Sequence, residues 1–137
     1  MDFRITCDGN PQDIQEIKQQ LAAYNQSRCP DVPSLPLGIF YEDEAGRKLA
    51  GITGDSSGDW LCIDFLFVSE SLRGQGIGQK LLTAAEEEGR KRGCKQIFLY
   101  TWSFQAPGFY EKMGYRCGLC LEGFPVMGNK YFMIKTL

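Results

Sequence analysis

Residues 60–78 constrain the fold more than any other part of the chain. They begin with an almost entirely apolar run, WLCIDFLFV, over Trp60–Val68, in which Asp64 is the one charged residue. Such a run predicts a strand buried on both faces of a sheet. Three glycines follow at alternate positions: Gly74, Gly76 and Gly78. Helical spacing of apolar residues starts at Ile77, so a buried strand, a glycine-rich turn and a helix occur in direct succession.

The whole sequence predicts strands and helices of a single domain, residues 1–137. Apolar spacing and capping residues predict three helices, over Pro11–Asn25, Ile77–Arg92 and Gln105–Met113. Short apolar or alternating runs predict seven strands: Phe3–Thr6, Leu37–Glu42, Lys48–Gly54, Trp60–Val68, Gln96–Thr101, Tyr115–Leu121 and Lys130–Lys135. Opposite charges four residues apart near the end of the second helix predict a solvated face: Glu86–Arg90, Glu87–Lys91 and Glu88–Arg92. Neither a repeat nor a linker interrupts this order, and 137 residues suit one core.

Composition excludes several classes of protein. Histidine is absent, which removes the usual general base and the commonest metal ligand, so we expect neither a Ser-His-Asp or Cys-His hydrolase nor a metal site. Fifteen basic against 17 acidic residues give a net charge of −2, which argues against binding to nucleic acid or an anionic membrane. The N-terminus resembles no secretory signal, and no apolar run is as long as a membrane span. The expected location is the cytoplasm, where the six cysteines stay reduced.

The glycine-rich turn is a candidate anion site. The first amides of a helix lack intrahelical acceptors and carry the positive end of the helix dipole, and glycine lets an anion approach the backbone closely. Arg73 can add a charge-assisted hydrogen bond to the same anion. A P-loop would need Gly-Lys-Ser/Thr, and a dinucleotide-binding loop would need GxGxxG after the first strand; the chain has neither. The residues alone leave two interpretations open, a phosphate site and a purely structural start of a helix.

Two segments of the chain resemble the GCN5-related N-acetyltransferase (GNAT) superfamily. Arg73-x-x-Gly76-x-Gly78 is similar to the acetyl-CoA signature of this family, Arg/Gln-x-x-Gly-x-Gly/Ala, and Val68 stands before it where the family expects. The segment APGFYEKMGY, residues 106–115, resembles the family's A-x-x-F-Y-E-K-x-G-F/Y. The order of strands and helices is similar over nearly the whole chain, whereas the matched motifs lie between Asp64 and Tyr115.

The resemblance implies an α+β fold with a central mixed, mostly antiparallel, twisted sheet of about seven strands flanked by helices. The fourth and fifth strands would splay apart, and acetyl-CoA would lie in the gap with its pantetheine arm on the backbone of Phe67 and Val68. Its pyrophosphate would bind the turn formed by Arg73, Gly74, Gln75, Gly76, Ile77, Gly78 and Gln79. The family often has Asn where this chain has Ser103, so Ser103 is a weaker cofactor contact or the N-cap of the next helix. Such folds also allow a homodimer through the C-terminal strands, which the sequence itself does not show.

Two residues are candidates for catalysis of acetyl transfer to an amine. Tyr110 matches the family tyrosine near the CoA sulfur, where a phenol can protonate the leaving thiolate; the alternative is a core tyrosine. Asp64 is a candidate base or anchor for the amine, because a carboxylate in an apolar strand needs partners or a role; the alternative is a group satisfied by backbone donors. A backbone N–H near Phe67 and Val68 would polarise the thioester carbonyl. No cysteine stands out as an acylated intermediate, so direct attack in a ternary complex is expected.

The expected function is therefore acetyl-CoA-dependent N-acetylation of a primary amine on a small molecule. Trp102 and Tyr24 are the candidate substrate-binding residues, because aromatic side chains can line an amine pocket. Two alternatives stay open: acetylation of a protein lysine or N-terminus, and an acyl-CoA-binding module without turnover. The sequence does not identify the acceptor.

Overall fold

The computed structural model describes residues 2–29 and 33–137, and the chain divides into two units, residues 1–32 and 33–137. The first unit contains helix α1 (Pro11–Arg28). It begins as the sequence predicts, with the side chain of Asn10 accepting a 2.9 Å hydrogen bond from the N–H of Gln12. Among the described residues, no helix is long and apolar enough to cross a membrane.

The strand expected over Phe3–Thr6 is wrong. Residues 3–6 form no strand, and the first unit contains no other strand with which they could pair among its described residues. A strand needs a partner for its backbone N–H and C=O groups, and alternation of apolar residues over four positions does not provide one.

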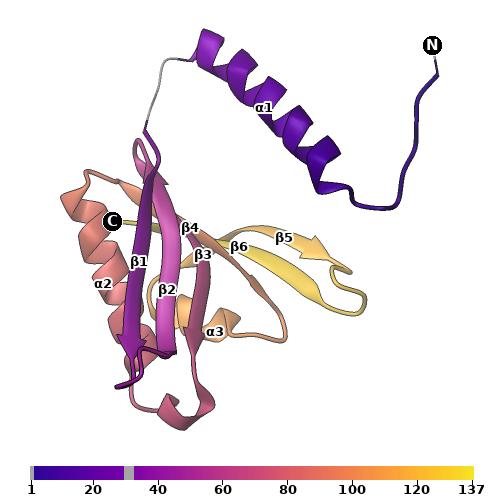
Figure 1. Ribbon diagram of the computed structural model, residues 1–137. Coiled ribbons are helices and arrows are strands. Elements are labelled where there is room, and N and C mark those ends of the chain that lie inside the picture. The colour runs from indigo at the N-terminus through magenta and orange to yellow at the C-terminus, as the bar shows by residue number, and fades with distance from the viewer. Residues whose placement is uncertain (1, 30–32) are drawn as a thin grey trace. The chain divides into compact units, whose positions relative to one another are not determined.

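The second unit is a mixed sheet of six strands with two helices (Figure 1). The strands are β1 (Leu35–Glu42), β2 (Lys48–Ser57), β3 (Trp60–Val68), β4 (Gln96–Trp102), β5 (Arg116–Glu122) and β6 (Asn129–Thr136), and the helices are α2 (Ile77–Lys91) and α3 (Pro107–Lys112). Their order across the sheet is β1-β2-β3-β4-β6-β5, where only β3 and β4 pair in parallel. The predicted fold class is therefore confirmed, with one strand fewer than expected.

The core lies on the face of the sheet that α2 covers. Alternate side chains of β3 and β4 point to this face, among them Leu61 and Ile97, which are fully buried and pack with Leu82 of α2. Within the second unit, only one face of Trp60–Val68 is buried, whereas the sequence predicts burial of both faces: Phe65 and Phe67 are 69% and 57% exposed. The opposite face of the strand carries these aromatic side chains, and neither α2 nor α3 covers it.

One acidic residue of α2, Glu86, is buried, although the sequence predicts that it lies on a solvated face. The carboxylate of Glu86 is 3% exposed, and its oxygens lie 2.5 and 3.2 Å from Nζ of Lys135 on β6. Glu88 and Arg92 do form the predicted pair, at 3.0 Å. The spacing of charges along a helix therefore predicted one of the pairs correctly, whereas Glu86 has a tertiary partner instead.

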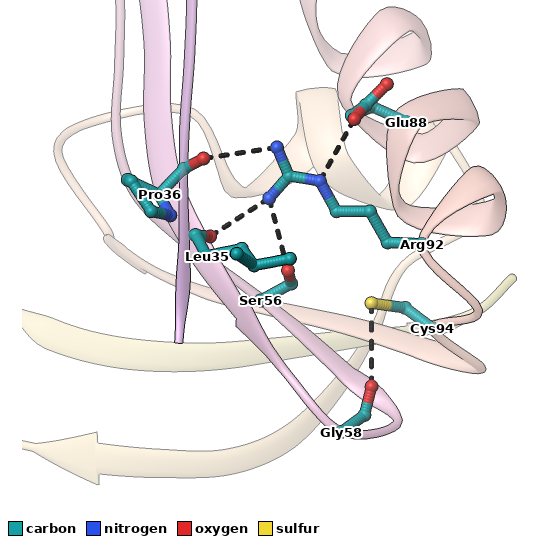
Figure 2. Close-up of polar contacts among 7 residues, drawn as sticks. All are labelled: Leu35, Pro36, Ser56, Gly58, Glu88, Arg92 and Cys94. Carbon is teal, nitrogen blue, oxygen red and sulfur yellow. Dashed lines mark hydrogen bonds and ion pairs between the residues drawn. The ribbon is translucent and has the colours of Figure 1, made fainter. Parts of the chain in front are cut away.

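Arg92, the residue that follows α2, connects the helix to the outer strands (Figure 2). Its guanidinium donates hydrogen bonds to the carbonyl oxygens of Leu35 at 2.9 Å and Pro36 at 3.1 Å, and to the buried hydroxyl of Ser56 at 3.1 Å. A third nitrogen binds Glu88. This planar group with several donors therefore fixes α2 against β1 and β2, and with it the glycine turn at the other end of the helix.

We expect Arg92→Ala to lower the free energy of unfolding by about 2 kcal/mol, because four acceptors lose their charged donor. Arg92→Lys should recover little of this loss, since an ammonium group cannot reproduce the planar arrangement of donors of the guanidinium. Denaturant unfolding of both variants checks this, with Glu88→Gln as the control that removes only the half-exposed ion pair. A lysine variant as stable as the original chain would contradict the role given to the guanidinium.

Candidate active site

Strands β3 and β4 separate in the middle of the sheet, as the sequence predicts for its fourth and fifth strands. They pair only at their N-terminal ends, through Trp60–Gln96, Leu61–Ile97 and Cys62–Phe98. Beyond these pairs, the edge of β3 from residue 63 to residue 68 has no partner on the side of β4 within the second unit, residues 33–137 (Figure 1). Its backbone groups are therefore available to a ligand that lies between the two strands.

A β-bulge at Asp64 marks the point where the strands part. Thr53 of β2 pairs with Phe65 and Gly54 pairs with Ile63, which leaves Asp64 as the extra residue. The bulge requires glycine at position 54, because a Cβ atom there would lie 2.0 Å from the carbonyl oxygen of Cys62. Gly54 of β2 thus makes room for the bulge at Asp64 in the neighbouring strand, β3.

The separation of the strands forms a groove of about 900 Å³. Its walls come from β3, β4, the glycine turn and α3, and its lining includes these predicted site residues: Asp64, Phe67, Val68, Arg73, Gly74, Gly76, Ile77, Gly78, Gln79, Trp102 and Tyr110. Residues from both faces of the sheet line it. Phe109 and Tyr110 belong to the side that packs with α2, whereas Asp64, Tyr100 and Trp102 belong to the opposite side. The groove thus joins the two faces.

The glycine turn has the backbone that an anion site needs. Gly74 and Gly76 have φ angles of +79° and +75°, and no atom lies within 4 Å of where their Cβ atoms would be. Gly76 is the cap of α2, so the amides of the first helical turn lack acceptors within the helix and point out of its N-terminus. Nε of Arg73 donates to the carbonyl oxygen of Val68 at 3.3 Å, which holds this cation beside the end of β3.

Tyr110 lies where the groove meets the core. It belongs to α3, is 9% exposed, and its ring packs edge-on against those of Phe109 and Tyr115. Burial raises the pKa of the Tyr110 phenol above its ordinary value of 10.0. The phenol therefore stays protonated at neutral pH, which is the state required of a proton donor; its catalytic role stays a prediction.

Asp64 lies in an acidic environment that also contains a thiol. Potential ligand atoms of Asp55, Cys62 and Asp64 all lie within 4.8 Å of one another, and Sγ of Cys62 is 3.8 Å from Oδ1 of Asp64. Burial, and then the charges of Asp64 and Asp55, raise the pKa of the Cys62 thiol to about 11. Cys62 is therefore a neutral thiol at pH 7 and a poor nucleophile. Asp64 itself is exposed within the second unit, contrary to the burial that the apolar strand predicted.

We expect Asp64→Asn to accelerate alkylation of Cys62 at pH 8. Removing the carboxylate lowers the pKa of the thiol, and the fraction of reactive thiolate rises. Iodoacetamide labelling followed by peptide mass spectrometry measures the rate at each cysteine separately. Cys94, which has no contact with Asp64, is the internal control, and an unchanged rate at Cys62 would show that the carboxylate does not act on the thiol.

Two of the predicted site residues in the second unit, Ser103 and Gln75, are not brought into the groove. The hydroxyl of Ser103 accepts a 3.0 Å hydrogen bond from the N–H of Asn129, and Ser103 is not among the residues that line the groove. Gln75 belongs to the turn but also lies outside the lining; its side chain donates to the carbonyl oxygen of Ser71 at 3.4 Å. Tyr24 belongs to the first unit, where Arg28 lies 5.1 Å above its ring.

Sequence reasoning missed Gln105, whose side chain stabilises the end of β4. Its Oε1 accepts hydrogen bonds from the N–H of Trp102 at 3.1 Å and from the hydroxyl of Thr101 at 3.3 Å. Gln105 also lines the groove. A glutamine between a strand and a short helix carries no signal of this role, because its partners are set by the turn that follows β4.

Comparison with known proteins agrees with this geometry. The model of the acetyltransferase (GNAT) family matches residues 8–115, and the chain belongs to this family. Over 114 residues it is 33% identical to a blasticidin-S acetyltransferase of Streptomyces morookaense, covering 80% of this chain and 84% of the relative. A crystal structure of a putative acetyltransferase from Agrobacterium tumefaciens is 31% identical, with a TM-score of 0.92 and full coverage of both chains. A putative streptothricin acetyltransferase from Bacillus anthracis, solved in complex with acetyl coenzyme A, shares the fold with a TM-score of 0.66 at 16% identity, over 81% of this chain and 67% of that one.

Proposed function

We propose that the protein transfers the acetyl group of acetyl-CoA to a primary amine of a small molecule. The observation that carries this proposal is the groove where β3 and β4 separate, which ends on the amides of the glycine turn and borders Tyr110. The turn suits the pyrophosphate, and the unpaired edge of β3, including Phe67 and Val68, suits the amides of the pantetheine arm. The B. anthracis protein of the same fold is solved with acetyl coenzyme A, which supports this choice of donor.

In the proposed reaction, the neutral amine attacks the thioester carbonyl carbon directly. A C–N bond forms, the C–S bond breaks, and the CoA thiolate takes the proton of the Tyr110 phenol. The proton that the new amide loses returns to the tyrosinate through solvent, which restores the acid. Backbone N–H groups on the unpaired edge of β3 stabilise the developing oxyanion.

The acceptor approaches from the side of the groove that carries Asp64, because the other side is occupied by α2 and α3. There, Asp64 attracts the ammonium form of the amine and orients it toward the thioester, and the ammonium group loses a proton to solvent before the neutral amine attacks. The 33% identity to a blasticidin-S acetyltransferase supports an amine-bearing antibiotic as a first acceptor to test.

Release of free thiol from acetyl-CoA across a panel of amines tests the proposal. The panel includes blasticidin S, polyamines, amino acids and a lysine peptide. Thiol release with a small amine supports the proposed function. Release with the peptide alone indicates a protein acetyltransferase, and acetyl-CoA binding without release for any amine indicates a module that only binds the donor.

A further inference from the structure

Lys130 of β6 lies inside a box of aromatic rings. Its Nζ is 4.0 Å from the ring centroid of Tyr100, 5.0 Å from that of Trp102, 5.2 Å from that of Phe132 and 5.4 Å from that of Phe124. The sheet register builds this box, since Lys130 pairs with Trp102 and Phe132 pairs with Tyr100 across β4 and β6. We call these four rings and Lys130 the aromatic box.

The charge of Lys130 is held in place without being neutralised. Four rings hold the ammonium group in place by cation–π attraction. Among the described residues, no carboxylate forms an ion pair with Lys130. The aromatic box therefore presents a fixed positive charge, which repels a second cation and attracts an anion.

The aromatic box adjoins the groove on the face that carries Asp64. Tyr100 and Trp102 are shared, because they form the box and also line the groove. Asp64 lies on the same face, since its carboxylate contacts Cys62, which pairs with Phe98 of β4 two positions before Tyr100. One wall of the groove thus carries a carboxylate, and the ammonium group of Lys130 lies against two aromatic side chains of the other wall, Tyr100 and Trp102.

We propose that Lys130 binds a carboxylate of the acceptor, so that the substrate is an amine that also carries a carboxylate. The ammonium form of the acceptor lies toward Asp64 in the groove, and its carboxylate lies toward Lys130 in the adjoining aromatic box, so each charge of the acceptor meets an opposite charge. Lys130 is then a specificity-determining residue that takes no part in the chemical step. This inference rests on the proposed function, because it names the class of its acceptor.

The test compares amino acids with their carboxamides, which differ in charge but hardly in size, using acetyl-CoA as donor. We expect kcat/KM to be at least about tenfold higher for the acids than for the carboxamides, because the acids form one additional ion pair. The difference should lie mainly in KM. Lys130→Met should remove the preference, whereas Lys130→Arg should keep most of it because the guanidinium also stacks on aromatic rings and binds carboxylates. Lys91→Met, which removes an exposed lysine of α2, is the matched control and should behave as the original chain.

A binding experiment separates this inference from the proposed function. In protein with 13C-labelled lysine and bound CoA, the Cε signal that Lys130→Met removes should move on addition of the acids and not of the carboxamides. A signal that moves while no amine releases thiol would overturn the proposed function alone. A signal insensitive to the acids, or a preference for acids that survives Lys130→Met, would overturn the role of Lys130. The role of Lys130 would also be overturned if Lys130→Met affected only the reaction of succinyl-CoA with amines that carry no carboxylate. That result would mean that Lys130 binds a carboxylate of the acyl group.

Discussion

Replacing Tyr110 with phenylalanine should lower kcat for acetyl transfer at least roughly tenfold and leave the affinity for acetyl-CoA unchanged. The change removes one hydroxyl from a ring that is buried against Phe109 and Tyr115, so the packing of α3 is retained. What is lost is the proton for the CoA thiolate, which is needed only as the C–S bond breaks. Steady-state kinetics and calorimetric titration with acetyl-CoA measure the two quantities separately.

Tyr41→Phe on β1 is the matched control, because this tyrosine is half exposed and does not line the groove. Equal kcat values for Tyr110→Phe and Tyr41→Phe would show that Tyr110 is a core residue only. The pH dependence gives a further check. Because burial raises the pKa of Tyr110, the acid form is lost only as pH rises above 10.0, so any fall in kcat below that value must come from another group.

Gly54→Ala should deform the groove, although residue 54 does not line it. A Cβ atom would lie 2.0 Å from the carbonyl oxygen of Cys62 and 3.0 Å from its carbonyl carbon, and backbone atoms cannot give way as a flexible side chain can. We expect the bulge at Asp64 to be lost or the unfolding free energy to fall by about 3 kcal/mol. Acetyl-CoA binding should weaken in proportion, because β3 would no longer diverge from β4 at the same residue.

Gly108→Ala is the control for this substitution. Gly108 lies in α3 with no atom within 4 Å of its Cβ position, and alanine favours a helix, so this variant should be as stable as the original chain or slightly more stable. Thermal unfolding and titration with acetyl-CoA distinguish the two variants. Normal stability and normal binding in Gly54→Ala would mean that the bulge does not shape the groove.

Local sequence patterns predicted most helices and strands of this fold. They failed where a strand or its burial depends on a segment elsewhere in the chain. Asn10 and Gly93 predicted the start of α1 and the end of α2, because capping depends on residues within one turn. Phe3–Thr6 has the pattern of a strand but forms none in the first unit, which offers no other strand among its described residues. The apolar run of β3 predicted burial on two faces, whereas α2 covers only one of them in the second unit.

The parts of the candidate site that lie within a single sequence motif could be predicted. The glycine turn before α2 and the segment around Tyr110 are each a continuous sequence motif, so both could be found from the sequence alone. Gly54 gave no such signal, because its importance comes from a contact with a neighbouring strand. Lys130 likewise has no motif, since the aromatic box depends on the register between β4 and β6. Such features follow from pairing between distant segments, which a single sequence does not fix.

A crystal structure of the protein with acetyl-CoA tests the central claim most directly. The account predicts the pyrophosphate on the backbone amides at the start of α2, beside Arg73, and the pantetheine arm along the unpaired edge of β3. The thioester sulfur should then lie within hydrogen-bonding reach of the Tyr110 hydroxyl. Phosphates bound away from the glycine turn, or an arm that does not pass between β3 and β4, would contradict it.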